Sequence, residues 1–287
     1  MKKKLLAMIL SAAMIISLTA CTADTKKEST TEASSVATTE SKETTEVTEI
    51  AGIKLIKPGT LSIGVEIGYP PFEDFAEDGT TPIGYDIDFA NALGDKLGLE
   101  INFVNTAWDG IFQGIGVNYD CVISAVTITD ERKVTMMFSD PYINNFQAVV
   151  VMPDYAGTIE GFLDLDGLTV AVQKETTSDI LISDYVATGS MACTISANEK
   201  ITTCFSQLAN GEVDAVVVDS TVADGYLAAN PGTYVKAFQD ESEPEQFGVA
   251  MALDNTELQA AINEAIAELT DEGFFVDNIE FWFGAAE

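Results

Sequence analysis

From residue 53 onward, short apolar runs alternate with longer segments in which apolar residues recur at helical spacing. In residues 85–97 the apolar side chains fall on one face of a predicted helix, which ends before Gly98. Strands are predicted at 61–65, 101–104 and 120–125, with a short helix at 108–116. This order favours a largely parallel sheet with helices on both faces.

The same order recurs in the second half of the chain. Strands are predicted at 168–172, 192–195 and 214–218, and helices at 178–188 and 198–210. Two extended apolar runs, 146–152 and 247–253, are predicted to carry the chain between the halves. An amphipathic helix at 256–269 then follows the second run.

We therefore expect an α/β fold with two lobes joined by a two-strand hinge. Lobe 1 is predicted at 53–145 and 248–287, lobe 2 at 146–247, and the hinge crossings near 143–148 and 244–249. The cleft between two such lobes is a natural ligand site.

The first 20 residues have the pattern of a signal peptide rather than of a folded element. A basic start is followed by an apolar stretch at 5–18 that is short for a membrane span. Leu18-Thr19-Ala20-Cys21 resembles a bacterial lipobox, which predicts a lipid anchor on Cys21 at the extracytoplasmic face of the cell membrane. The alternative is an ordinary signal peptide with Cys21 incidental. Residues 21–52 are polar and predict a flexible tether.

The formal net charge of −32 argues against a nucleic-acid partner, because no basic stripe is present to neutralise phosphates. The chain has no histidine, which removes the usual proton shuttle and most zinc sites. Beyond Cys21, three cysteines remain, so at least one is unpaired within the chain. Spacing leaves open whether Cys193 and Cys204 form a disulfide.

The segment from Ser124 to Arg132 predicts a buried strand that ends in hydroxyls and leads into a helix capped by Thr129 or Asp130. Arg132 then lies in the first helical turn, where a cation opposes the helix dipole and needs an anionic partner. The Thr127 hydroxyl, free backbone N–H groups and Arg132 are suited to one small anion such as a carboxylate. The alternative is a structural salt bridge from Arg132 to Asp130, Asp140 or another acid.

Six segments together resemble the extracellular solute-binding proteins of polar-amino-acid ABC transporters. They are Tyr69-Pro70-Pro71-Phe72, Gly84-Tyr85-Asp86-Ile87-Asp88, the 124–132 and 138–142 segments, Val213-Asp214-Ala215-Val216 and Phe281-Trp282-Phe283-Gly284. The resemblance implies a periplasmic-binding-protein fold of two Rossmann-like lobes that close around one free amino acid. It also implies a monomeric, non-enzymatic protein without cofactor or metal, which delivers its ligand to the membrane subunits of an ABC permease.

The resemblance also implies roles for individual residues. Arg132 would hold the ligand α-carboxylate, assisted by the Thr127 hydroxyl and the backbone of Ser124 or Ala125. Asp219 would take the α-ammonium; its alternative role is to cap the helix that follows.

Other residues would surround the ligand side chain. Tyr69 and Trp108 would flank it, although two aromatics alone are equally typical of ordinary packing. The loop 173–178 would close over the ligand, which adds Gln173 and Thr177 to the predicted contacts. Relatives often have Gly where this loop has Glu175, a departure that is expected to alter the backbone. Glu66 is either a further ligand contact or a solvated acid at a strand end.

Two other classes of function are compatible with these residues. One is a dehydratase-like enzyme on the same fold, with Lys174, Glu175 and Glu66 as candidate acids or bases. The other is an amino-acid sensor domain, which would carry a transmembrane helix and a signalling region after Gly284. For the binding protein, Glu66 and the acidic body favour a polar or basic amino acid, including cystine or another diamino compound.

Overall fold

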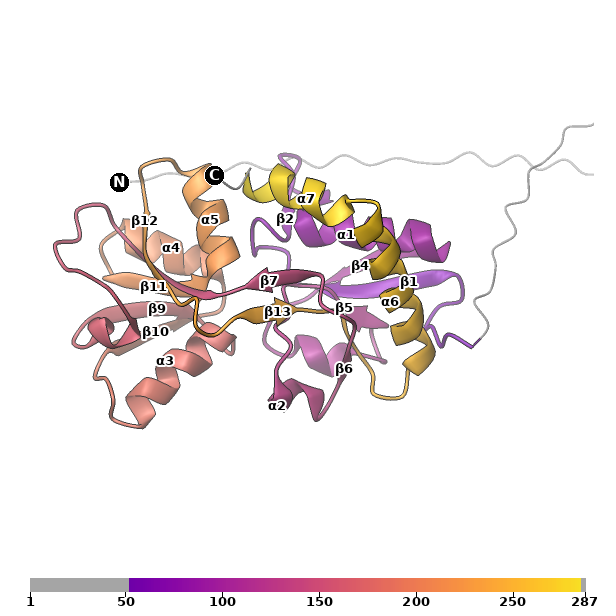
Figure 1. The fold of residues 1–287 in the computed structure, drawn as a ribbon, viewed down its shortest axis with the longest axis horizontal. Helices are drawn as coiled ribbons and strands as arrows, with labels where there is room; N and C mark the ends of the chain where they lie inside the picture. The colour runs from indigo at the N-terminus through magenta and orange to yellow at the C-terminus, as the bar shows by residue number, and fades with distance from the viewer. Residues whose placement is uncertain (1–51, 285–287) are drawn as a thin grey trace, which may run out of the picture. The chain divides into compact units, whose positions relative to one another are not determined.

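The computed structural model describes residues 52–284 (Figure 1). Its first sheet has the strand order β4-β1-β5-β14-β6. The central strand β1 (Thr60–Val65) pairs in parallel with β4 (Glu100–Asn105) and β5 (Cys121–Val122). The edge is antiparallel, because β14 (Ala250–Met251) runs against both β5 and β6 (Met137–Phe138). We refer to this sheet and its helices as lobe 1.

Three helices pack together in lobe 1: α1 (Tyr85–Leu97), α6 (Thr256–Asp271) and α7 (Phe274–Phe283). The predicted helix at 85–97 is confirmed, and it ends because Gly98 takes a left-handed φ of 63°. Phe72 is fully buried against Tyr85, Phe247 and Phe283. A small hairpin of β2 (Asp74–Phe75) and β3 (Pro82–Ile83) precedes α1.

The second sheet has the order β10-β9-β11-β8-β12 and defines lobe 2. Its parallel strands are β9 (Thr169–Gln173), β10 (Thr194–Asn198) and β11 (Ala215–Asp219). Its antiparallel strands are β8 (Gln147–Val151) and β12 (Val235–Gln239). The helices are α3 (Thr177–Ala187), α4 (Ile201–Ala209) and α5 (Ser220–Ala229), with a 3₁₀ turn η2 (Phe162–Leu165).

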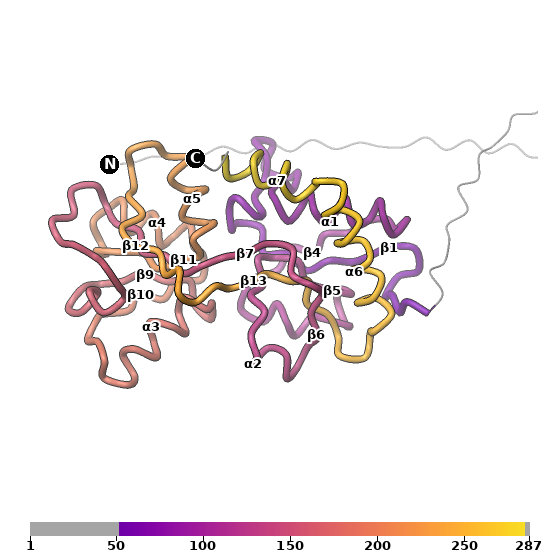
Figure 2. Tube along the Cα trace, in the orientation of Figure 1, coloured from indigo at the N-terminus to yellow at the C-terminus, as the bar shows by residue number. Residues whose placement is uncertain are grey.

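Two short strands join the lobes. β7 (Ile143–Asn145) and β13 (Glu245–Phe247) pair antiparallel, and both segments run from one lobe to the other (Figure 2). Both crossing strands lie within the ranges expected for the hinge, 143–148 and 244–249. The apolar run 146–152 does not itself make the crossing, because Gln147–Val151 is already strand β8 of lobe 2. Both lobes belong to one compact unit, Glu46–Glu287.

Two further predictions need adjustment, and one open question is answered. The helix expected at 108–116 is only a 3₁₀ turn, η1 (Ile111–Gly114), and the strand expected at 120–125 pairs only at Cys121–Val122. Beyond that strand the chain turns, with Ala125 at a φ of 48°. Cys193 and Cys204 are free thiols, which answers the question that spacing left open.

The predicted signal peptide, the lipidation at Cys21 and nearly all of the tether lie outside the described residues. Within residues 52–284, no helix is both long and apolar enough to span a bilayer.

Candidate functional site

All ten residues predicted to contact a ligand line one cavity between the lobes. The space among the side chains that line it, open solvent included, is about 290 Å³. Its lining consists of Glu66, Tyr69, Trp108, Ser124, Ala125, Thr127, Arg132, Gln173, Thr177 and Asp219, together with Thr176, which had not been predicted. The structure therefore brings the predicted set together, while their roles toward a ligand stay predictions.

Strand ends explain why these side chains meet. Glu66 follows β1 and Ser124 follows β5, while Gln173 and Asp219 are the last residues of β9 and β11. The carboxyl ends of parallel strands share one edge of a sheet, and this edge is where open α/β sheets bind ligands. Each lobe thus contributes one such edge to the cavity.

Arg132 lies in the short helix α2 (Asp130–Lys133), which is capped by Thr129 as predicted. The Thr129 hydroxyl accepts a 3.2 Å hydrogen bond from the Arg132 backbone N–H. The guanidinium donates to the Thr127 backbone oxygen at 2.8 Å and lies 5.5 Å from the centre of the Trp108 ring. This stacking on an aromatic face holds the guanidinium beside the cavity.

Arg132 is the only arginine of the chain, and it forms no ion pair with any residue of the 52–284 segment. The alternative salt bridge to Asp130 is not formed, because Asp130 pairs instead with Lys133 at 3.3 Å. Burial lowers the pKa of Arg132, while the charges of Asp219 and Glu245 act in the opposite direction. A guanidinium this close to a cavity, with no paired carboxylate, is suited to an anionic ligand.

Asp219 is 5% exposed and faces the same cavity from lobe 2. It accepts hydrogen bonds from the Tyr69 hydroxyl, from Asn145 Nδ2 at 2.6 Å and from Gln147 Nε2 at 3.0 Å. Its carboxylate does not cap α5, so the alternative capping role is excluded. Burial, and then the nearby charge of Glu245, raise its pKa. A cation placed next to this buried acid would stabilise its charged form.

Glu245, on the crossing strand β13, was missed by the sequence analysis. Its carboxylate accepts from Thr127 Oγ1 at 3.1 Å, from Gln147 Nε2 at 3.1 Å and from Thr177 Oγ1 at 3.4 Å. The residue therefore contacts both lobes at the place where the chain crosses between them. Its sequence signal, an acid within a run of acids at 240–245, did not distinguish it from its exposed neighbours.

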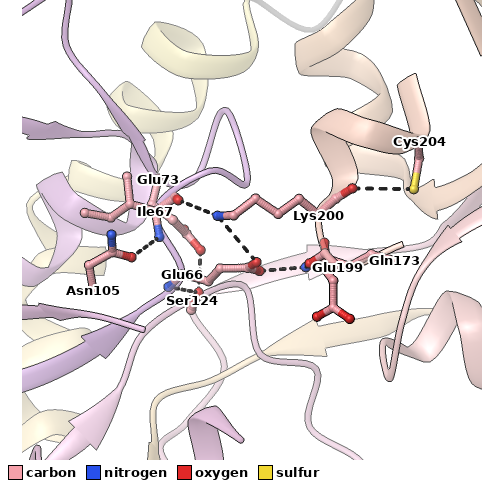
Figure 3. Close-up of polar contacts among 9 residues, drawn as sticks. All are labelled: Glu66, Ile67, Glu73, Asn105, Ser124, Gln173, Glu199, Lys200 and Cys204. Carbon is pink, nitrogen blue, oxygen red and sulfur yellow. Dashed lines mark hydrogen bonds and ion pairs between the residues drawn. The ribbon is translucent and has the colours of Figure 1, made fainter. Parts of the chain in front are cut away.

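Glu66 also lines the cavity and is 2% exposed. Gln173 Nε2 of lobe 2 donates to Glu66 Oε2 at 2.7 Å, and Lys200 Nζ lies 3.9 Å from Glu66 Oε1 (Figure 3). Burial raises the pKa of Glu66 to about 7, although Gln173 and Lys200 partly oppose this shift. The alternative reading of Glu66 as a solvated strand-end acid is therefore wrong.

The loop after β9 reaches lobe 1 through its backbone. Trp108 Nε1 donates to the backbone oxygen of Glu175 at 3.2 Å, and Thr176 Oγ1 caps α3 by accepting from Asp179 N at 3.3 Å. Glu175 has a φ of 62°, in the left-handed region that favours glycine. Neither Glu175 nor Lys174 lines the cavity, so neither occupies the place of a catalytic acid or base.

Two buried acids that the sequence analysis did not predict, Glu73 and Asp86, accept hydrogen bonds from the Ser124–Ala125 turn. The Ser124 hydroxyl donates to Glu73, and Asp86 Oδ2 accepts from Ala125 N at 2.7 Å and from the Tyr142 hydroxyl at 3.1 Å. Burial raises the pKa of both acids. They fix the backbone from which the predicted carboxylate contacts project. Asp86 lies in a segment that carried the resemblance, but its spacing gave no sign of this role.

Residues 61–285 match the model of the family described as bacterial extracellular solute-binding proteins, family 3. The chain belongs to this family. Among solute-binding relatives, the L-cystine-binding protein TcyJ of Escherichia coli K12 is 33% identical over 234 residues, which is 81% of this chain and 85% of the relative. The ABC transporter arginine-binding protein 1 of the same organism is 31% identical, over 78% of this chain and 90% of the relative.

Solved structures of solute-binding proteins agree with the fold. An ancestral arginine-binding protein bound to arginine superposes with a TM-score of 0.73 at 35% identity, covering 79% of this chain and 99% of the other. The predicted two-lobed fold and the resemblance to solute-binding proteins are thereby confirmed. Each of these three relatives is named as a binding protein rather than as an enzyme.

Proposed function

We propose that this solute-binding protein captures one free amino acid between its lobes and delivers it to an ABC permease. The observation that carries the proposal is the pair of unmatched charges that line one cavity. Arg132 has no carboxylate partner in the 52–284 segment, and Asp219 has only neutral donors within hydrogen-bond distance. A zwitterion supplies both missing charges at once.

The two ends of the ligand would be held from different lobes. Its α-carboxylate would accept from the Arg132 guanidinium and the Thr177 backbone N–H, and from the Thr127 hydroxyl, which would turn from Glu245 to the ligand. The Ala125 N–H is already held by Asp86 and would not take part. Its α-ammonium would donate to Asp219. Buried charges without partners are costly, so binding requires both ends to be paired. Because such a ligand bridges the lobes, it shifts the population toward the closed arrangement.

The remaining wall would select the side chain. Tyr69 and Trp108 present aromatic surface, and Glu66 with Gln173 forms a polar end. This combination supports a polar or basic amino acid as the ligand. Arginine and cystine are among the first candidates, because two relatives are named as arginine- and cystine-binding proteins.

The test is a thermal-shift screen of the common amino acids and cystine against the protein without its first 20 residues. A ligand that binds only the folded state raises the melting temperature, and the same ligand at the same concentration should raise that of Arg132→Ala less. Absence of a shift with every amino acid would overturn the proposal. Intact amino acid recovered after incubation would distinguish binding from dehydratase-like turnover.

We also propose that the protein acts as a monomer held at the extracytoplasmic face of the membrane by a lipid on Cys21. Support comes from the basic start, the apolar stretch and the lipobox-like Leu18–Cys21 segment. Cells that express the full chain should incorporate radiolabelled fatty acid into it. The Cys21→Ala variant should incorporate none, and continued labelling of that variant would refute the anchor.

A further inference from the structure

Lys200 of lobe 2 reaches across to the strand end of lobe 1. It precedes α4, and its Nζ donates to the backbone oxygen of Ile67 at 3.0 Å (Figure 3). The same atom lies 2.9 Å from the position that a Cβ on Gly68 would occupy, and Gly68 has a φ of 128°. The glycine therefore leaves room for the ammonium group at the end of β1.

Glu66 lies between this ammonium and the cavity. It lines the cavity and is 2% exposed, whereas Lys200 is outside the lining and its side chain is 46% exposed. Lys200 Nζ is 3.9 Å from Glu66 Oε1, and Gln173 Nε2 occupies the other oxygen at 2.7 Å. The Glu66 carboxylate, which lines the cavity, thus already has a cation close to it.

We propose that Lys200 is a specificity-determining residue that acts through Glu66 and lowers the preference of the cavity for cationic over neutral side chains. The proposal rests on the proposed function, since it concerns the side chain of the same amino-acid ligand. A cationic side chain that approaches Glu66 from the cavity is attracted by the carboxylate and repelled by Lys200 behind it. A neutral polar side chain feels little of either charge, so Lys200 changes the ratio of the two affinities.

The charge effect is separable from any effect on closing of the lobes. Loss of the contact between Lys200 and Ile67 would weaken the closed arrangement for every ligand alike, and this common factor cancels in a ratio. L-Arginine and L-citrulline form a suitable pair of probes, because the neutral urea of citrulline replaces the guanidinium with little change of shape. The quantity to measure is the Kd of citrulline divided by the Kd of arginine.

Calorimetry at pH 8.5 on wild type and Lys200→Met gives this ratio. This pH lies above the pKa of about 7 that burial gives Glu66, so the carboxylate stays largely ionised when Lys200 no longer lowers its pKa. We expect it to rise about tenfold in Lys200→Met, the scale of one close charge at an intermediate dielectric. Lys200→Arg, which keeps the charge, should return the ratio toward wild type. Lys236→Met is the matched control, because Lys236 is also in lobe 2 but pairs with Asp224 at 2.6 Å and lies outside the cavity lining. Its ratio should equal that of wild type.

Each outcome is decisive. A ratio that changes less than twofold in Lys200→Met, or that changes equally in Lys236→Met, overturns the role of Lys200 and leaves the proposed function intact. If wild type binds neither probe but binds another amino acid, a gain of arginine binding in Lys200→Met supports the role and its absence overturns it. If wild type binds no amino acid, the proposed function fails and the role of Lys200 falls with it.

Discussion

The Tyr69 hydroxyl donates a hydrogen bond to the Asp219 carboxylate and so links the two lobes across the cavity. Tyr69 follows β1 of lobe 1, and Asp219 ends β11 of lobe 2. Every hydrogen-bond donor that reaches Asp219 from the described residues is uncharged, although the acid is almost fully buried. This is the arrangement expected of an acid that awaits a cation.

Asp219→Asn tests this relationship directly. The amide keeps the size of the side chain but removes the charge that the ligand ammonium would meet. A charge-assisted hydrogen bond contributes roughly 1.5–3 kcal/mol, so we expect affinity to fall by roughly ten- to a hundredfold. Calorimetry with the amino acid found by screening measures this change. Asp224→Asn, an acid of the same lobe outside the cavity lining, is the control and should bind normally.

The stability of the ligand-free protein should depend on pH through Glu66. Its pKa rises from 4.5 to about 7 in the folded protein, mainly through burial. Between these values the native state binds more protons than the unfolded state, so the free energy of unfolding falls as pH rises through this window. Urea unfolding at pH 5 and pH 8 should show the fall, and Glu66→Gln should reduce it. An equal pH dependence in Glu66→Gln would show that Glu66 makes no contribution.

Replacing Glu175 with glycine should stabilise the folded protein. Its φ of 62° is unfavourable for an L-residue, and its backbone contacts to Trp108 and Asp179 need no side chain. Glu175→Gly is therefore expected to raise the free energy of unfolding by about 1 kcal/mol. Glu175→Ala separates the backbone effect from loss of the carboxylate, since alanine keeps the steric penalty. Equal stabilities of the two variants would argue against backbone strain at this position.

The elements that bury one apolar face were predictable from spacing. The helix α1 agrees with its predicted bounds because its apolar positions repeat regularly and Gly98 ends it. The apolar run 146–152 was assigned to the crossing, although most of it is the buried strand β8; the crossing strand β7 is the shorter segment Ile143–Asn145, which contains two asparagines. Strand pairing in three dimensions, rather than local pattern, determines where the crossing falls.

The residues of the site also fall into those that could be predicted from the sequence and those that could not. Gln173 and Asp219 were predicted through the resemblance to solute-binding proteins, and the structure places both at the ends of parallel strands of one sheet. Glu245 and Lys200 were not, since each reaches the site through contacts made only in the folded chain. Glu245 lies opposite Asn145 because β13 pairs with β7, and Lys200 meets lobe 1 only when the lobes are together. The local sequence pattern predicts neither the pairing of β13 with β7 nor the contact of Lys200 with Ile67.

The measurement that tests the central claim most directly is the affinity of Arg132→Ala for the screened amino acid, measured by calorimetry beside wild type. The variant strands the ligand carboxylate in a buried cavity, so we predict that affinity falls by at least about tenfold. Lys133→Ala, which removes the neighbouring exposed cation, should bind as wild type does. Unchanged affinity in Arg132→Ala would contradict the claim that this guanidinium and Asp219 hold the two ends of one amino acid.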